Sequence, residues 1–397
     1  FTAMETAPHP HHHTCATFVV KGEQLLSLTS EDWTARDAPM TPFPGLFDPL
    51  KQMALVDDYI HNQPTYPFLE AMERGSITSQ GLIFSRYLPS PLTKRLFLSK
   101  YVIDLVKGIY FSHPSRANGD FFSHEDRSLL FDLAKFGIPT YWLDRSARDV
   151  LQYIPRPDKD SGMFVPLRHI STFINATMIG VYGSVFVEGE FEQFLIELLK
   201  GLLALRSDVT HPLLSEGTPL ALVTGGGPGA MLDGNKAARA TNILSCANIV
   251  DFTKAPEALS EQEINPYIDA KMTYRIDKLV ERQAEFHLDL PIFLKGGIGT
   301  DFEYALENVR RKIGAMRPTP ILLVGSPSYW RKKITPTYQL NLESGTISGS
   351  EWISNCFYAV ETPQQALAVY RAYFSGRLGI GPGGPIYKEG FTSAPDL

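Results

Sequence analysis

Two glycine-rich segments have the composition of phosphate-binding turns. The first, TGGGPGAM, runs from Thr224 to Met231, and the second, KGGIGT, runs from Lys295 to Thr300. A strand-like apolar run precedes each segment and a helical pattern follows it. Glycine lets a backbone approach an anion closely, and a helix N-terminus offers unpaired N–H groups and a positive dipole. We therefore expect these turns to bind phosphate, although glycines also permit tight turns in any α/β fold.

An acidic and a basic residue accompany the second segment. Glu303 follows Thr300 by three residues, so we place its carboxylate on the first turn of the next helix, pointing back toward the ligand. The helix dipole there favours the ionised carboxylate, which would also suit a purely structural glutamate. Arg282, on the preceding helical pattern, either offers the complementary charge or lies on a solvated helix face.

The elements that must position these residues alternate between strand and helix from about Thr177 onward. Strands are predicted at 178–182, 220–224, 243–250, 291–294, 320–324 and 356–360, and helices at 191–206, 230–240, 266–288, 301–316 and 362–374. Thr362 is the predicted N-cap of the last helix. This alternation predicts an α/β fold with a Rossmann-like doubly wound parallel sheet, whose ligands bind at the carboxyl ends of the strands.

Three regions follow from these patterns. Residues 166–375 form the Rossmann-like domain, and a solvent-exposed connection at 156–162 separates them from an accessory region at 1–165. The accessory region is predicted to be mostly helical or mixed, and largely irregular. Its predicted elements are helices near 48–62, 93–109 and 124–136 and a strand at 139–143. Residues 376–397 are rich in glycine and proline, which predicts a mobile or loosely docked tail.

Composition excludes several classes of protein. The 397 residues include 37 Lys and Arg against 43 Asp and Glu, and the resulting net charge of −6 argues against nucleic-acid binding. Apolar residues make up 44% of the chain, which indicates a globular rather than a disordered protein. No apolar run reaches the roughly 18 residues of a membrane-spanning helix, so we expect no membrane partner.

Cysteine and histidine usage indicates a cytoplasmic protein without a structural metal. Cys15, Cys246 and Cys356 lie far apart and form no CxxC pair, so neither a disulfide framework nor a zinc site is expected. The N-terminal segment has four histidines between residues 9 and 13 but lacks the basic start and apolar centre of a secretory signal. We interpret these histidines as an incidental tail.

The second glycine segment resembles the hallmark of the LONELY GUY (LOG) family, which is also called lysine-decarboxylase-like. That hallmark is Pro-Gly-Gly-x-Gly-Thr-x-x-Glu, and residues 295–303 read KGGIGTDFE, with Lys295 in place of the proline. The first segment is especially similar to the bacterial branch of pyrimidine/purine nucleotide 5′-monophosphate nucleosidases. Gly183 and Ser184 fit the first strand turn of the family. The resemblance covers about residues 170–375.

The resemblance implies hydrolysis of the N-glycosidic bond of a nucleoside 5′-monophosphate to free base and ribose 5-phosphate, by a homodimer or higher homo-oligomer without a cofactor. The implied catalytic residues are Glu303 and Arg282, with Arg275 as the second candidate for the arginine. The implied phosphate- and nucleotide-binding residues are Gly183, Ser184, Gly225, Gly226, Gly227, Gly229, Met231, Lys295, Gly296, Gly297, Gly299 and Thr300.

Such hydrolysis passes through an oxocarbenium-like ribose, so a carboxylate near the anomeric carbon would stabilise the positive charge and orient or deprotonate water. The alternative is a non-catalytic nucleotide-binding or sensing protein with the same turns. A dinucleotide-dependent oxidoreductase and a P-loop protein are disfavoured, because neither segment matches GxGxxG or GxxxxGK[ST]. Lys295 would either strengthen the phosphate site or adapt it to another ligand. Base specificity stays open.

Overall fold

The computed structural model describes residues 15–19, 33–36, 69, 72–75, 80–114, 119–144, 147–156, 161–251 and 263–394. The chain is an α/β protein whose β-structure is mixed but mostly parallel. It divides into two compact units. The first comprises residues 1–170 and 272–279, and the second comprises residues 171–271 and 280–397.

The second unit contains a parallel sheet with the strand order of a Rossmann fold. In order across the sheet, its strands are β15 (Thr392–Ser393), β14 (Phe357–Val360), β13 (Ile321–Val324), β12 (Leu290–Phe293), β8 (Thr177–Tyr182), β9 (Leu220–Thr224) and β10 (Leu244–Val250). The pairings between neighbours in this series are all parallel. The chain starts at β8, moves outward to β10, and then returns to β12 on the other side of β8. This reversal is the topological switch point of a doubly wound sheet.

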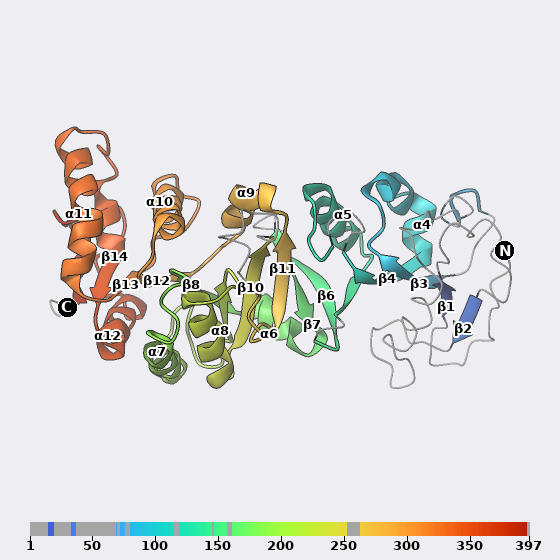
Figure 1. Cartoon of the computed structure of the whole chain (residues 1–397), viewed down its shortest axis with the longest axis horizontal. Helices are drawn as coiled ribbons and strands as arrows, with labels where there is room; N and C mark the ends of the chain where they lie inside the picture. Colours follow the sequence, from blue (N-terminus) through green and yellow to red (C-terminus); the bar gives the residue numbers. More distant parts are fainter. Residues whose placement is uncertain are drawn as a thin grey trace. The chain divides into compact units, whose positions relative to one another are not determined.

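Helices cover both faces of this sheet, as Figure 1 shows. On one face lie α7 (Glu192–Leu205), α8 (Ala230–Ala240) and α12 (Pro363–Phe374), and on the other α9 (Leu279–Ala284), α10 (Ile298–Lys312) and α11 (Pro327–Glu343). Leucines of α7 at helical spacing pack with buried strand residues such as Ile179 and Leu222 to form the core. Thr362 accepts a hydrogen bond from the Gln365 N–H at 3.2 Å, which confirms the predicted N-cap.

Two predicted elements in this part of the chain have the wrong extent, and the helix α11 was not predicted at all. A strand, β11 (Ala270–Tyr274), and the short helix α9 replace the long helix predicted at 266–288. The charged residues after Tyr274 suggested a helix. The residues before Tyr274 form a strand instead, because hydrogen bonds to distant segments fix their conformation; for example, the Asp269 N–H donates to the Ser245 carbonyl at 2.8 Å. The second correction concerns α10, which begins at Ile298 rather than Asp301.

The first unit has more regular structure than the sequence patterns predicted. In order across its mixed sheet, the strands are β7 (Ser161–Pro166), β6 (Asp149–Arg156), β5 (Thr140–Asp144), β4 (Val106–His113), β3 (Gly81–Tyr87), β1 (Cys15–Val19) and β2 (Trp33–Arg36). Several of these strands are buried almost throughout, so they lack the alternation that marks half-exposed strands.

Helices in the first unit match the predictions in part. The helix α5 (His124–Lys135) confirms the prediction at 124–136, and Ser123 caps it in a reciprocal capping box with Asp126. The predicted helix at 93–109 is divided into α3 (Lys94–Phe97) and α4 (Lys100–Leu105), and β4 starts directly afterwards. The helix predicted near 48–62 lies outside the described residues.

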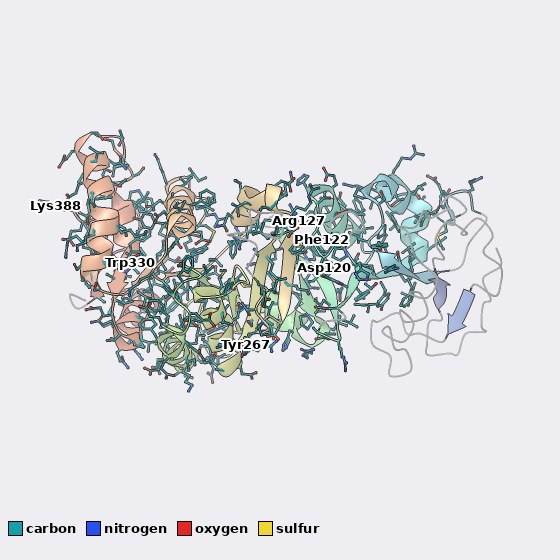
Figure 2. All side chains as sticks on the ribbon, in the orientation of Figure 1. Asp120, Phe122, Arg127, Tyr267, Trp330 and Lys388 are labelled. Carbon is teal, nitrogen blue, oxygen red and sulfur yellow. The ribbon has the colours of Figure 1, made fainter. Side chains whose placement is uncertain are left out.

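Residues 272–279 return to the first unit from far along the chain. The Thr273 hydroxyl donates to the Asp120 carbonyl at 2.7 Å, and Tyr274 forms a parallel bridge with Phe122. The guanidinium carbon of Arg127 lies 4.5 Å from the centre of the Tyr274 ring, a cation–π distance. Figure 2 labels Asp120, Phe122 and Arg127 in this region.

The C-terminal segment is docked, which corrects the prediction of a loose tail. The Asn355 amide donates to the carbonyls of Gly381 and Pro385 at 3.0 and 3.1 Å, and its oxygen accepts from the Gly381 N–H at 2.7 Å. Phe391 is only 2% exposed, and β15 extends the sheet beyond β14. Glycine and proline here shape a loop that a buried amide holds, so their abundance did not indicate mobility. None of the described helices is long and apolar enough to cross a membrane.

Candidate functional site

The switch point brings three strand ends together. β8 pairs in parallel with both β12 and β9, so the turns after these three strands leave the sheet at the same edge. The turn after β8 contains Gly183 and Ser184, the turn after β9 is the first glycine segment, and the turn after β12 is the second glycine segment. Sequence spacing placed each turn at a strand end, and the strand order makes them neighbours.

The backbone of Ser184 connects both glycine segments. Its N–H donates to the Lys295 carbonyl at 2.9 Å, and its carbonyl accepts from the Ala230 N–H at 3.0 Å. A Cβ atom at Gly183 would lie 2.6 Å from the Cβ of Ala230 and 3.0 Å from that of Leu294. Any larger residue at position 183 would therefore push the turns apart.

The first glycine turn needs glycine at two positions with positive φ. Gly229 has φ +67°, and a Cβ there would lie 2.4 Å from backbone atoms of Val185. Gly226 has φ +78° and packs against Ile249. The Met231 sulfur accepts from the Gly227 N–H at 3.4 Å, so this side chain folds back over the turn.

A buried amide network that the sequence analysis missed supports the first turn. Asn265 donates from its side chain to the Gly227 carbonyl at 3.0 Å, and its backbone N–H donates to the Gly226 carbonyl at 2.9 Å. The same amide donates to Asn235, which also accepts from the Thr224 hydroxyl at 2.6 Å. An asparagine on the buried face of α8 was the only sequence signal for this network.

Among the described residues, the N-termini of α8 and α10 have no side-chain cap, and in α8 the first N–H, that of Ala230, already donates to the Ser184 carbonyl. Both N-caps are glycines, Gly229 and Gly297. By contrast, Ser326 and Thr362 cap α11 and α12 through their side-chain oxygens. The first N–H groups of a helix have no intrahelical partner, so α10 presents those of residues 298–300 at the second turn. Thr300 packs against Gly296, where a Cβ would lie 2.0 Å from its hydroxyl oxygen.

Glu303 lies on the second turn of α10, partly buried, because the helix begins earlier than predicted. Burial raises its pKa from 4.5 to about 7, against the opposing effects of a hydrogen bond from Gln283 and the charge of Arg282. The helix dipole was expected to favour the ionised carboxylate, but desolvation outweighs it at this depth. A carboxyl with this pKa can accept or release a proton near pH 7.

Gln283 links Glu303 to Arg282. Its amide nitrogen donates to the Glu303 carboxylate at 3.0 Å, and its oxygen accepts from the Arg282 guanidinium at 3.0 Å. Arg282 is only 6% exposed, so it does not lie on a solvated helix face. It also donates to the Asn248 carbonyl at 2.9 Å and reaches the Gly225 carbonyl at 3.5 Å. The acidic and basic candidates thus meet beside the first turn, through a glutamine to which no role had been assigned.

The other charged candidates have different surroundings. Arg275 belongs to the first unit and forms an ion pair with Asp277 at 3.3 Å. Lys295 forms an ion pair with Glu190 at 2.5 Å and lies 5.9 Å from the centre of the Phe191 ring. Its ammonium group is therefore engaged within the protein, and about two-fifths of the side chain is exposed.

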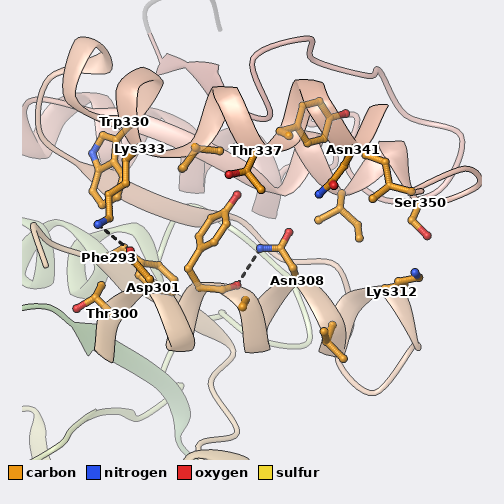
Figure 3. Close-up of a pocket in the computed structure, with 17 residues that line it drawn as sticks. Phe293, Thr300, Asp301, Asn308, Lys312, Trp330, Lys333, Thr337, Asn341 and Ser350 are labelled. Atoms are coloured by element: carbon orange, nitrogen blue, oxygen red, sulfur yellow. Dashed lines mark hydrogen bonds and ion pairs between the residues drawn. The ribbon is translucent and has the colours of Figure 1, made fainter. Parts of the chain in front are cut away.

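A cavity of about 500 Å³ lies between α10 and α11 (Figure 3). Thr300 and Asp301 line one end, but neither Glu303 nor Arg282 lines the cavity. Lys333 binds Asp301 at 2.7 Å and donates to the Gly296 carbonyl at 2.9 Å. The cavity therefore lies behind the second glycine turn and shares its supporting residues. In the described part of the chain, no group of three His, Cys, Asp or Glu side chains could hold a metal ion.

Comparison with known proteins found similarity in structure only. Neither a protein-family model nor a curated protein matches the sequence. The molybdenum cofactor binding protein from Rippkaea orientalis is 15% identical over 50% of this chain and 97% of its own, with a TM-score of 0.31. The molybdenum cofactor carrier protein from Chlamydomonas reinhardtii is 17% identical over 50% of this chain and 99% of its own, with a TM-score of 0.32.

Proposed function

We propose that the chain is a nucleoside 5′-monophosphate phosphoribohydrolase, which cleaves the N-glycosidic bond to give free base and ribose 5-phosphate. The observation that carries the proposal is the Arg282–Gln283–Glu303 chain beside the first glycine turn. Glu303 lies on the helix that begins at the second turn, so one ligand can contact a phosphate site and the carboxyl group.

The glycine turns supply the phosphate site in this proposal. The open N-terminus of α10, with its glycine N-cap, would bind the phosphate through its backbone N–H groups, and the positive ends of α8 and α10 both attract a phosphate dianion. The phosphate does not react, so its binding energy serves to hold the ribose in place. This division of roles fits a monophosphate better than a free nucleoside, which has no anion for the turns to bind.

Glu303 supplies the proton transfer. Its ionised carboxylate takes a proton from water while the water oxygen bonds to C1′ of the ribose. The C1′–N bond breaks, and its electron pair leaves with the base, which takes up one proton from solvent while Glu303 releases the proton it took from water. The ionised carboxylate also stabilises the positive charge that develops on the ribose. A pKa of about 7 makes this base about half ionised at neutral pH. Arg282 would position the nucleotide or assist departure of the base.

Non-catalytic nucleotide binding or sensing is the second candidate, and one observation favours it. Arg282 donates to protein acceptors, the carbonyls of Asn248 and Gly225 and the side chain of Gln283, and is almost fully buried. An arginine engaged in this way can stabilise a binding turn without touching a substrate. The two candidates differ in turnover, not in nucleotide binding.

The test measures release of ribose 5-phosphate from AMP, GMP, IMP, CMP, UMP and isopentenyl-AMP. We expect turnover of at least one monophosphate by the wild type, and a loss on the order of 10²-fold or more in Glu303→Gln, which keeps the shape but cannot accept the proton. Glu343→Gln, at an exposed position of α11, is the matched control and should retain full activity. Binding of a monophosphate without turnover would favour the sensing protein, and equal activity of Glu303→Gln would refute the proposed role of Glu303.

A further inference from the structure

A buried charged triad lies on α10, directly after Glu303. Glu307, Arg310 and Arg311 have side-chain exposures of 1%, 7% and 0%. The Glu307 carboxylate binds Arg310 at 3.3 Å and Arg311 at 2.5 Å, and it accepts from the Tyr182 hydroxyl at 3.1 Å. Burying three charges is costly, and one acid facing two arginines leaves an excess positive charge. The second arginine therefore needs an explanation beyond the ion pair.

Arg310 binds the carboxyl end of α9. Its guanidinium donates to the carbonyls of Gln283 at 2.8 Å and Ala284 at 2.6 Å, and also to the carbonyl of Phe286. The last carbonyls of a helix have no intrahelical partner, and α9 has only six residues, so these contacts are a large part of what fixes its end. The negative ends of these carbonyl dipoles also stabilise the excess positive charge of the triad.

This helix end carries the two residues that face Glu303. The backbone of Gln283 is held by Arg310, while its side chain connects Arg282 to the Glu303 carboxylate. A shift of the α9 end would therefore break the bond to Glu303 and move Arg282 away from the first glycine turn. We propose that Arg310 is a positioning residue that holds Arg282 and Gln283 of α9 against Glu303 of α10. This inference deepens the proposed function and rests on it for its catalytic consequence.

Arg311 provides a matched control within the same triad. It binds the same Glu307 carboxylate and is equally buried, but it also donates to the Glu307 backbone carbonyl and the Thr319 hydroxyl, each at 3.2 Å, and neither acceptor belongs to α9. A lysine at either position keeps the positive charge next to Glu307. The compact ammonium cannot span the carbonyls that the Arg310 fork reaches. Both Arg310→Lys and Arg311→Lys should thus lower the free energy of unfolding by a comparable amount. Only Arg310→Lys loses the contacts with α9.

The experiment compares the two variants in three measurements. Amide hydrogen exchange at residues 282–286 should be faster in Arg310→Lys than in Arg311→Lys, relative to the wild type. The Glu303 carboxyl, followed by carbon NMR and assigned with Glu303→Gln, should titrate at higher pH in Arg310→Lys, because the Gln283 hydrogen bond that lowers its pKa is lost. The other charged or titratable groups near Glu303 are Arg282, Glu307 and Tyr182, which both variants keep. With turnover established, kcat/KM should fall on the order of ten- to hundredfold more in Arg310→Lys.

Equal exchange rates and equal Glu303 titration in the two lysine variants would overturn the inference. So would a fall in kcat/KM that merely follows the loss of stability. Failure of the proposed function can be distinguished from failure of this inference, because hydrogen exchange and titration need no substrate. If the wild type shows no turnover, these two measurements still test the role of Arg310. A faster α9 exchange with no turnover in the wild type would support Arg310 as the positioning residue and reject the hydrolase.

Discussion

Glu303 shows how position along a helix changes the chemistry of one carboxyl group. On the first turn of α10, solvent and the helix dipole would have kept it ionised. On the second turn, burial raises its pKa to about 7 although Arg282 and the Gln283 amide both favour the charged form. The neighbouring Glu307 acts in the same direction as burial. A residue with this pKa can change its protonation state within the physiological range.

The raised pKa of Glu303 predicts a pH dependence of stability. The native state holds the proton more tightly than the unfolded state, whose glutamate titrates near 4.5. The contribution of Glu303 to the free energy of unfolding therefore decreases as pH rises from about 4.5 to about 7, by up to about 3 kcal/mol, and stays low above that. Urea unfolding at pH 5 and pH 8 should show Glu303→Gln gaining clearly more stability relative to the wild type at pH 8 than at pH 5. An equal difference at both pH values would contradict this assignment.

At the level of elements, the two glycine turns differ in what fixes their conformation. Buried amides of Asn235 and Asn265 hold the first turn, and Gly229 lies against the backbone of Val185. The second turn is the start of α10, where a Cβ at Gly297 or Gly299 would meet open space. The first turn is therefore packed into the protein, and the second is open to a ligand.

Replacement of Gly229 tests this packing. Alanine at Gly229 would combine an unfavourable positive φ with a clash against backbone that cannot move aside, so we expect a loss of roughly 2–4 kcal/mol of stability and weaker AMP binding. Gly217→Ala is the control, because it has φ +78° but open space around the Cβ, and should cost only about 1 kcal/mol. Urea unfolding and calorimetric titration with AMP distinguish the two. Equal losses of stability in Gly229→Ala and Gly217→Ala would show that the positive φ, and not the packing against Val185, determines the loss.

At the scale of the whole molecule, α10 exposes an apolar face. Ile298, Phe302, Val309 and Ile313, which we call the α10 stripe, are all exposed and recur at helical spacing. Ile298 is 90% exposed. Such a row on a helix that also carries Glu303 is typical of an interaction surface. This exposed stripe leads us to propose self-association through α10.

Substitutions on the α10 stripe test self-association. We expect a dimer or larger oligomer in light scattering after size-exclusion chromatography, and at least a tenfold weaker association in the double variant Val309→Glu with Ile313→Glu, because two carboxylates per copy would be desolvated. Ile174→Glu, on α6 (Ile170–Asn175), is the control at a similarly exposed apolar residue. A monomeric wild type, or an oligomer that both variants leave intact, would reject this surface.

The sequence by itself determined where the glycine turns of the second unit lie and most of the elements beside them, but it did not reveal α11. The ranges of β9 and α8 match the prediction residue for residue, because a buried strand, a glycine turn and an amphipathic helix each have a local signature. In the first unit the same local reasoning anticipated α5 and, at 139–143, the strand β5. It failed at 266–288 and missed strands such as β4, because β11 and β4 form through contacts with distant segments.

Only the tertiary structure decided how the site is assembled. The order of parallel strands places the turns after β8, β9 and β12 side by side, and pairing between distant segments has no short-range signal. The pKa of Glu303, the burial of Arg282 and the bridging role of Gln283 depend on desolvation and on hydrogen bonds between α9 and α10. Residue types were therefore sufficient to nominate Glu303 and Arg282 but not Gln283, and the local dielectric and the non-local contacts set the chemistry of all three.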